Sequence, residues 1–220
     1  MSRRLKHDLA GPDWRVSLED VRAKGWEALF APDLAPPLRL VLEIGFGRGE
    51  FLMQLARLAP GTAHVAVEVS WKRVLKLARR LSRSELRNVR LVHATGEQLV
   101  AEGIAPGSLA EVWINFPDPW PKKRHQRRRL LQPGLVAALA ERLAPGGTLH
   151  VATDDRAYAE QIDRALAGEP RLANAYAPEP WLPEVPGRLP TAYELAWRAE
   201  GRALHFWAYR RRIDPREPVS

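Results

Sequence analysis

The chain has 220 residues, 45% of them hydrophobic and 27% charged, which fits one globular domain with a full core. Its 34 Lys and Arg outnumber 26 Asp and Glu, and the net charge of +8 favours an anionic partner such as a nucleic acid. The chain has no Cys and its six His are scattered, so we expect no metal site. It has no apolar run near the roughly 20 residues of a spanning helix and no signal-peptide core, so we expect a cytoplasmic protein without a membrane segment.

The first part of the chain precedes the predicted sheet. Residues 18–30 form an amphipathic stretch that predicts a helix, and Pro36-Pro37 breaks the chain after it. We therefore expect a helical extension over residues 1–37, one larger domain over 38–211 and a short tail over 212–220.

A strand, a glycine loop and a helix are predicted next. Residues 40–44 are β-branched and aliphatic, glycines follow at 45, 47 and 49, and residues 50–58 favour a helix. Glycines let the backbone approach a ligand, and the N–H groups of the following helix favour an anion. A dinucleotide loop reads Gly-x-Gly-x-x-Gly, whereas here the third glycine lies two positions after the second and Glu43 stands two before the first. A tight turn without a ligand is the alternative.

Later strands alternate with room for helices. A strand at residues 64–69 contains Glu68, about twenty residues past the loop, where doubly wound folds place an acid over ribose hydroxyls. An ordinary surface charge is the alternative for Glu68. Further strands are predicted at 89–92, 111–116 and 148–153, so we expect an α/β fold whose mostly parallel sheet has helices on both faces. Polar residues at strand ends are candidates for chemistry: Glu43, Glu68, Asn115, Asp118 and Asp154.

Residues 115–130 read Asn-Phe-Pro-Asp-Pro-Trp-Pro-Lys-Lys-Arg-His-Gln-Arg-Arg-Arg-Leu. The prolines fix their own φ and push each preceding residue toward extended geometry, so we expect a rigid turn around Asp118. Trp120 either stacks on a base or packs under the turn. Six cations can neutralise RNA phosphates, the alternative being a solvated basic helix end: Lys122, Lys123, Arg124, Arg127, Arg128 and Arg129.

The last third of the chain predicts a helix, a proline-rich tract and a final strand. Residues 133–143 favour a helix that ends at Pro145-Gly146-Gly147. Six prolines between residues 168 and 190 indicate a flap or linker. Thr191 and Glu194 have the spacing of a capping box at a helix start, and a strand is predicted at 203–210.

Five segments together resemble the bacterial tRNA (guanine-N7)-methyltransferase family. They are Glu43-x-Gly-x-Gly-x-Gly, Glu68 at its strand end, Phe-Pro-Asp-Pro-Trp-Pro-Lys-Lys-Arg-His at 116–125, Ala-Thr-Asp at 152–154 and Thr-Ala-Tyr-Glu at 191–194. The resemblance covers about residues 38–211. It implies a Rossmann-like class I methyltransferase fold with an antiparallel C-terminal strand. It also implies methyl transfer from S-adenosylmethionine (SAM) to N7 of a variable-loop guanosine (guanosine 46) in tRNA.

The resemblance further implies a role for individual residues. Asp118 would be the catalytic-site acid. SAM would be held by Glu43, Gly45, Gly47, Gly49, Glu68, Ala94, Asn115 and Asp118. The tRNA or its guanosine would be contacted by Lys122, Asp154, Thr191, Tyr193 and Glu194, and the tRNA backbone by Lys123, Arg124, Arg127, Arg128 and Arg129. Ala94 and Ala192 depart from the family, which commonly has Asp or Asn near the adenine ring and Lys after the Thr.

The chemistry needs no base, because guanine N7 already offers a lone pair, so positioning and electrostatics carry the reaction. We expect Asp118, helped by Asp154 or Glu194, to accept hydrogen bonds from guanine N1–H and N2–H₂, an arrangement that disfavours adenine. The alternatives are another nucleic-acid base methyltransferase, a non-catalytic tRNA-binding protein and, more distantly, a nicotinamide oxidoreductase. Both a monomer and a homodimer fit the sequence.

Overall fold

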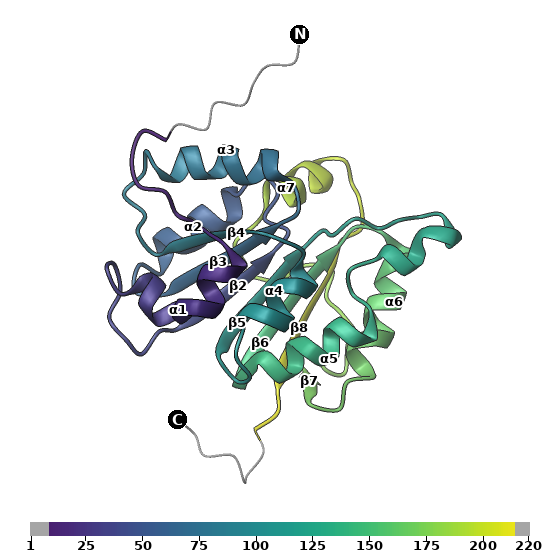
Figure 1. Cartoon of the computed structure of the whole chain (residues 1–220). Helices are drawn as coiled ribbons and strands as arrows, with labels where there is room; N and C mark the ends of the chain where they lie inside the picture. Colours follow the sequence, from purple (N-terminus) through teal and green to yellow (C-terminus); the bar gives the residue numbers. More distant parts are fainter. Residues whose placement is uncertain (1–8, 214–220) are drawn as a thin grey trace. The chain divides into compact units, whose positions relative to one another are not determined.

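The computed structural model describes residues 9–213, and the chain forms two compact units that join after Gly103 (Figure 1). The predicted extension at 1–37 ends inside the first unit, and its residues 1–8 lie outside the described part, as do residues 214–220 of the predicted tail. The predicted domain limits remain predictions.

The first unit is a parallel sheet with helices on both faces. Its strands lie in the order β1-β4-β3-β2, namely β1 (Arg15–Val16), β4 (Val89–His93), β3 (Ala63–Glu68) and β2 (Leu40–Ile44). Its helices are α1 (Leu18–Phe30), α2 (Glu50–Leu58), α3 (Trp71–Leu81) and α4 (Gly96–Gly103). Figure 1 shows α2 and α3 on one side of these strands and α1 and α4 on the other. The predicted strand at 40–44 and helices at 18–30 and 50–58 are confirmed.

The N-terminal segment is part of this unit. Every residue of β2 and β3 is buried, as expected for strands covered on both faces. At the edge of the sheet, β1 pairs with β4. The buried Arg90 of β4 donates to Leu29 O at 2.7 Å and to Asp33 at 2.6 Å. Its guanidinium also lies over the Phe30 ring at 4.5 Å. These contacts attach the segment that contains α1 to β4.

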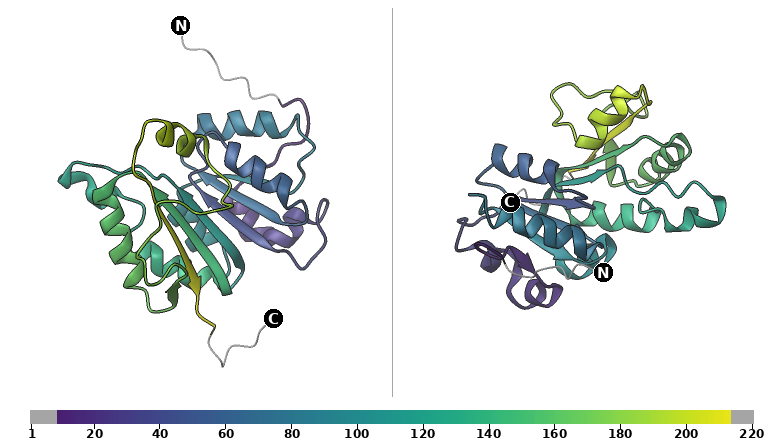
Figure 2. Two further views of the ribbon diagram at one scale, coloured as in Figure 1. Left: turned by 180° about the vertical axis from the view of Figure 1, so that it is seen from behind. Right: turned by 90° about the horizontal axis from the view of Figure 1, so that it is seen from above.

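The second unit is a mixed sheet in the order β5-β6-β8-β7. It comprises β5 (Leu109–Asn115), β6 (Leu143–Thr153), β8 (His205–Arg211) and β7 (Leu172–Asn174), and β8 is antiparallel to both neighbours. The predicted antiparallel C-terminal strand is confirmed. The helices are α5 (Pro133–Arg142), α6 (Arg156–Ala167) and α7 (Ala192–Ala199), with the 3₁₀ helix η1 (Lys123–Arg128) between β5 and α5. Figure 2 shows α7 and the segment before it across one face of this sheet, while α5 and α6 cover the other.

The predicted start of β6 is wrong. The strand predicted at 148–153 begins at Leu143, because Leu143 already pairs with Leu109 and the register shifts before Glu111 pairs with Thr148. This irregularity accommodates the Pro-Gly-Gly sequence inside the strand, and the preceding helix ends at Arg142.

The proline-rich tract at 168–190, predicted as a flap or a linker, is attached to the sheet. Its residues 172–174 form β7, which pairs with β8. Farther along, Leu182 and Phe206 exchange two backbone hydrogen bonds of 3.0 and 2.9 Å. Two separate backbone contacts with β8 therefore attach the tract to the sheet of the second unit. Among residues 9–213, no helix has both the length and the apolar character to cross a membrane.

Candidate functional site

The glycine loop between β2 and α2 depends on left-handed backbone geometry. Gly45, Gly47 and Gly49 have φ of 79°, 55° and 74°, values that residues with a side chain rarely adopt. Gly45 N donates to Val67 O at 2.8 Å, and Gly49 N donates to Phe46 O at 2.7 Å. The three glycines therefore set the path of the chain from β2 into α2.

Glu68 lies at the end of β3 and is only 3% exposed, so the alternative of an ordinary surface charge is wrong. Its carboxylate accepts from Gly47 N at 3.2 Å and from Ser70 N at 2.9 Å, with Arg73 Nη1 3.4 Å away. These bonds fix the carboxylate against the glycine loop. Glu43, in β2, is buried to the same degree.

Ala94 follows β4 and offers no polar side-chain atom. The backbone beside it is fixed, since Thr95 and Gln98 exchange side-chain to backbone bonds of 3.2 and 3.1 Å at the start of α4. A Cβ at Gly96 would lie 2.5 Å from Ile44 Cγ2, so α4 packs closely on β2 at this point. Only main-chain groups are thus presented at 94 and 96.

The Asp118 turn leaves β5 through two strained residues. Phe116 and Trp120 have φ of 52° and 41°, so the expectation of extended geometry before the prolines is wrong for these two residues. Left-handed backbone costs a residue with a side chain about 1–2 kcal/mol, and such strain clusters at functional sites. The Phe116 ring lies 4.9 Å from that of Trp197, edge to face, which holds the start of the turn against α7. Asp118 itself is exposed.

Trp120 packs beside the basic segment that follows it. The Arg128 guanidinium lies 5.1 Å from the Trp120 ring centroid, and the His125 ring lies 5.8 Å away. Trp120 is half-buried, so one surface of the side chain is still accessible. Packing under the turn therefore accounts for part of this side chain, and base stacking stays a prediction.

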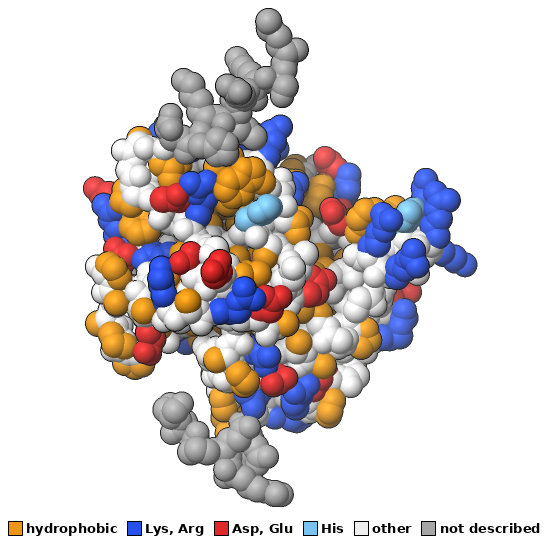
Figure 3. Space-filling model, in the orientation of Figure 1, with side chains coloured by type: hydrophobic (Ala, Val, Ile, Leu, Met, Phe, Trp, Pro, Cys, Tyr) orange, Lys and Arg blue, Asp and Glu red, His pale blue; other side chains and the backbone are white. Residues whose placement is uncertain are grey.

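Five of the six cations in the basic run are exposed, and one is not. The exposed ones, which we call the basic cluster, are Lys122, Lys123, Arg124, Arg127 and Arg128. Figure 3 shows Lys and Arg atoms gathered on the projection that η1 forms. Arg129 is 3% exposed and donates to Pro119 O at 2.7 Å and to Gln161 Oε1 at 2.8 Å, above the Tyr158 ring. Our expectation of a tRNA backbone contact for Arg129 is wrong, because its guanidinium is used to hold the turn against α6.

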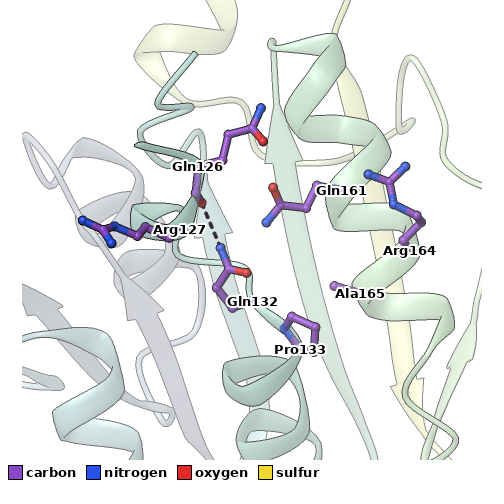
Figure 4. A pocket seen from close by; sticks show the side chains of 7 residues that line it. All are labelled: Gln126, Arg127, Gln132, Pro133, Gln161, Arg164 and Ala165. Atoms are coloured by element: carbon purple, nitrogen blue, oxygen red, sulfur yellow. Dashed lines mark hydrogen bonds between the residues drawn. The ribbon is translucent and has the colours of Figure 1, made fainter. Parts of the chain in front are cut away.

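A cleft of about 390 Å³ lies beside the basic cluster. Figure 4 shows the side chains of Gln126 and Gln161 directed toward one another across it, with Arg164 of α6 on the same side as Gln161. Gln132 donates to Gln126 O at 3.0 Å and so ties η1 to the start of α5. The lining residues are Gln126, Arg127, Gln132, Pro133, Gln161, Arg164 and Ala165.

The start of α7 forms half of the predicted capping box. Thr191 Oγ1 accepts from Glu194 N at 3.0 Å, which confirms Thr191 as the N-cap. The Glu194 side chain, 4% exposed, instead lies between two arginines: Arg188 bonds to its Oε2, and Arg198 donates to its Oε1 at 3.1 Å. Tyr193 is 42% exposed and faces outward from the same turn.

Two arginines complete this region, and neither stood out in the sequence. Arg188, whose side chain is 7% exposed, also donates from Nη2 to Asn115 Oδ1 at 2.5 Å. Burial lowers the pKa of Arg188, and the charge of Glu194 opposes that shift. Arg202 donates to Asp154 Oδ2 at 3.1 Å, just beyond the end of β6. Arg188 is one of two arginines in the proline-rich tract, and no local pattern distinguishes it from a surface arginine.

Comparison with known proteins gives the same family from two directions. A family model described as a putative methyltransferase matches residues 38–207. The tRNA (guanine-N(7)-)-methyltransferase of Bordetella pertussis is 47% identical over 176 residues, covering 76% of this chain and 69% of that protein. The enzyme of the same name from Geobacter metallireducens is 39% identical over 84% of this chain and 86% of its own length.

Solved structures are similar in fold. The 16S rRNA (adenine(1408)-N(1))-methyltransferase of Catenulisporales acidiphilia, determined with its cosubstrate SAM, has a TM-score of 0.56 at 19% identity over 92% of both chains. The antibiotic-resistance methyltransferase Kmr has a TM-score of 0.56 at 18% identity, over 90% of this chain and 93% of that one. The fold is thus that of the class I methyltransferases, and with relatives this similar the chain belongs to the tRNA (guanine-N7)-methyltransferase family.

Proposed function

We propose that this protein transfers the methyl group of SAM to N7 of the variable-loop guanosine, guanosine 46, in tRNA. The observation that carries the proposal is the exposed Asp118 carboxylate on a strained turn that runs directly into the basic cluster. The names of the relatives support the reaction, and the cosubstrate in the rRNA enzyme's structure supports the donor.

The first unit fits the cofactor. When bound, SAM supplies an electrophilic methyl group on its sulfonium. We assign the SAM carboxylate to the glycine loop at the start of α2, where N–H groups favour an anion, and the ribose hydroxyls to buried Glu68. Glu43 lies in the strand before the loop, and we assign the main chain at 94–96, which the Thr95–Gln98 bonds hold in place, to the adenine ring. In the second unit, Asn115 Nδ2 is buried without an acceptor among residues 9–213, as a ligand-binding amide would be.

Asp118 is the acid that we assign to the guanine edge. Glu194 already accepts from two arginines and Asp154 from Arg202, so these two carboxylates have partners within the protein. Asp118 is exposed, so it is accessible to guanine N1–H and N2–H₂. As the methyl group moves, the ring gains positive charge, which a carboxylate stabilises more in the transition state than before it.

The tRNA backbone is proposed to follow the basic cluster and the adjoining cleft. Cations on an exposed 3₁₀ helix suit phosphate contacts that do not depend on sequence. The cleft adds further hydrogen-bond donors, from Gln126 on η1 and from Gln161 and Arg164 on α6. Tyr193, exposed on α7, and Lys122, next to the turn, stay in the set that we propose for the guanosine and its neighbours.

The test is to incubate the protein with labelled SAM and an unmodified tRNA transcript, then to cleave with borohydride and aniline, which cuts at N7-methylguanosine. We expect a single cut, in the variable loop. Asp118→Asn and Asp118→Ala should each lower the rate by about 100-fold or more, while Glu160→Gln on the exposed face of α6 should keep it. Label transfer without a cut would favour another base methyltransferase, tRNA binding without transfer would favour a non-catalytic binder, and wild-type rates in both Asp118 variants would refute the role of Asp118.

A further inference from the structure

Arg188 connects two residues that belong to different elements. One nitrogen of its guanidinium bonds to Glu194 on α7, and another donates to the amide oxygen of Asn115 at the end of β5. The same side chain lies over the Phe206 ring at 4.8 Å and near the Trp113 ring at 5.8 Å. Its Nη1 also donates to Leu189 O at 3.2 Å. A planar cation fixed by three polar partners and two rings has little freedom to reorient.

The contact with Asn115 determines which way its amide faces. A guanidinium only donates, so the atom that it meets is the oxygen, and the nitrogen of the amide takes the other position. That nitrogen, Nδ2, is buried and has no acceptor within the described part of the chain. A buried donor without a partner costs about 1–3 kcal/mol, a cost that a ligand acceptor removes on binding.

Phe116, the residue after Asn115, is also held in place, by α7 and β6. Phe116, the first residue of the Asp118 turn, packs against Trp197 of α7, and its N–H donates to Ala152 O at 2.8 Å. Arg188 thus fixes the side chain of Asn115 while α7 and β6 fix the residue after it. The start of the turn is positioned before any ligand arrives.

We propose that Arg188 is a positioning residue that orients the Asn115 amide, so that Nδ2 donates to an acceptor atom of SAM or of the guanosine. The proposal rests on the proposed function for the identity of these ligands. Glu194 neutralises the buried cation and anchors it to α7. Asn115 makes the contact with the ligand, and Arg188 acts through Asn115.

The decisive variant is Arg188→Lys, with Arg198→Lys as the matched control. Lysine keeps the positive charge next to Glu194, but its ammonium lacks the planar fork that bonds Glu194 and Asn115 together. Arg198 pairs with the same carboxylate from a more exposed position and makes no contact with Asn115 in the described structure. We expect Arg188→Lys to lower kcat/KM by about 100-fold and Arg198→Lys by less than about fivefold, with both Tm values within about 4 °C of wild type.

A second measurement separates positioning from a general effect on folding. The Asn115 side-chain amide, assigned in ¹⁵N NMR spectra by its loss in Asn115→Asp, should shift in Arg188→Lys and not in Arg198→Lys. Titration of the wild type with SAM, and separately with guanosine monophosphate, should move that resonance with one of them, which identifies the source of the acceptor. If neither moves it, Asn115 does not contact the ligand and the proposal fails.

Three results would overturn the proposal independently of the proposed function. They are a wild-type rate in Arg188→Lys, a wild-type rate in Asn115→Ala, and an unchanged Asn115 resonance in Arg188→Lys. If Arg188→Lys does not fold, the Asn115→Ala rate and the wild-type titrations decide. If the wild type forms no N7-methylguanosine, the proposed function fails, and the NMR results still decide whether Arg188 orients the amide.

Discussion

Gly49 begins α2 with φ of 74° and lies against the buried Leu77. A Cβ at this position would lie 2.5 Å from both terminal methyl groups of Leu77, so Gly49→Ala adds a steric clash to the cost of left-handed backbone. Gly45 has φ of 79°, yet a Cβ there would meet nothing within 4 Å. Gly45→Ala therefore isolates the backbone cost.

We expect Gly45→Ala to lower the unfolding free energy by about 1–2 kcal/mol and Gly49→Ala by a further 1–3 kcal/mol or so from overpacking. Urea titrations of the two variants give both values, and calorimetry with the cofactor shows whether affinity falls in the same order. Equal destabilisation by the two substitutions would mean that Leu77 moves aside without cost.

The sequence predicts the backbone role of the loop glycines, but it does not predict the structural roles of Arg129 and Arg188. Glycine spacing reports a local backbone requirement, so the loop was identified correctly from residues 40–58 alone. The role of an arginine depends on what the fold brings near it. Arg129 is one of six adjacent cations and is the buried one, and Arg188 gains Asn115 from a strand 73 positions away.

At the scale of single elements, η1 carries the clearest expectation for tRNA binding. Lys123, Arg124 and Arg127 are exposed on this short helix. Each phosphate contact that is lost should reduce the slope of log affinity against log salt by about 0.7–0.9. Replacing all three with Ala should therefore weaken tRNA binding and reduce the slope by about two units, measured by filter binding over a range of KCl concentrations.

The control for this triple variant replaces two other exposed cations, each of which already forms an ion pair. Arg22 and Lys24 on α1 form ion pairs of 2.8 Å with Glu102 and Asp20, so replacing both with Ala should leave the salt slope almost unchanged. Arg129→Ala should lower stability and leave the slope intact, because its guanidinium holds the turn. An unchanged slope in the triple variant would place the tRNA on another surface.

Element boundaries were predicted well where the signal is local and poorly where pairing decides. Helix α2 matches residue for residue, since the glycine before it and the apolar stripe within it are both written in the sequence. The early start of β6 arises from pairing between Leu143 and Leu109, and the proline-rich tract is attached through β8. The sequence around Leu143 does not reveal its pairing with Leu109, and the sequence of the tract does not reveal its pairing with β8.

At the scale of the whole molecule, the candidate residues divide between the two units. The first contains the glycine loop and Glu68, and the second contains the Asp118 turn, the basic cluster and α7. The alternation of strands and helices predicted the α/β fold, because it is visible along the whole chain. The buried Arg188–Glu194 ion pair of the second unit joins the proline-rich tract to α7 and has no such pattern.

The pH dependence of global stability should reflect a half-buried histidine in the second unit, His150. His150 stacks on Trp113 with ring centroids 3.8 Å apart, and burial lowers its pKa from 6.5 to about 4, with Arg188 and Arg210 acting in the same direction and Glu111 against it. The folded protein therefore keeps His150 neutral where the unfolded chain takes up a proton. The contribution of neutral His150 to the unfolding free energy is fully present above pH 6.5 and is lost as the pH falls from 6.5 toward 4.

From these two pKa values, His150 should cost the fold about 3 kcal/mol between pH 6.5 and 4. Burial lowers the pKa of His205 as well, which adds a loss of the same sign. His150→Phe retains a ring against Trp113 and cannot titrate, so its unfolding free energy should fall less steeply than that of the wild type. Urea titrations of both proteins at pH 7, 5.5 and 4.5 measure the difference, and parallel curves would show that His150 is protonated in the folded protein.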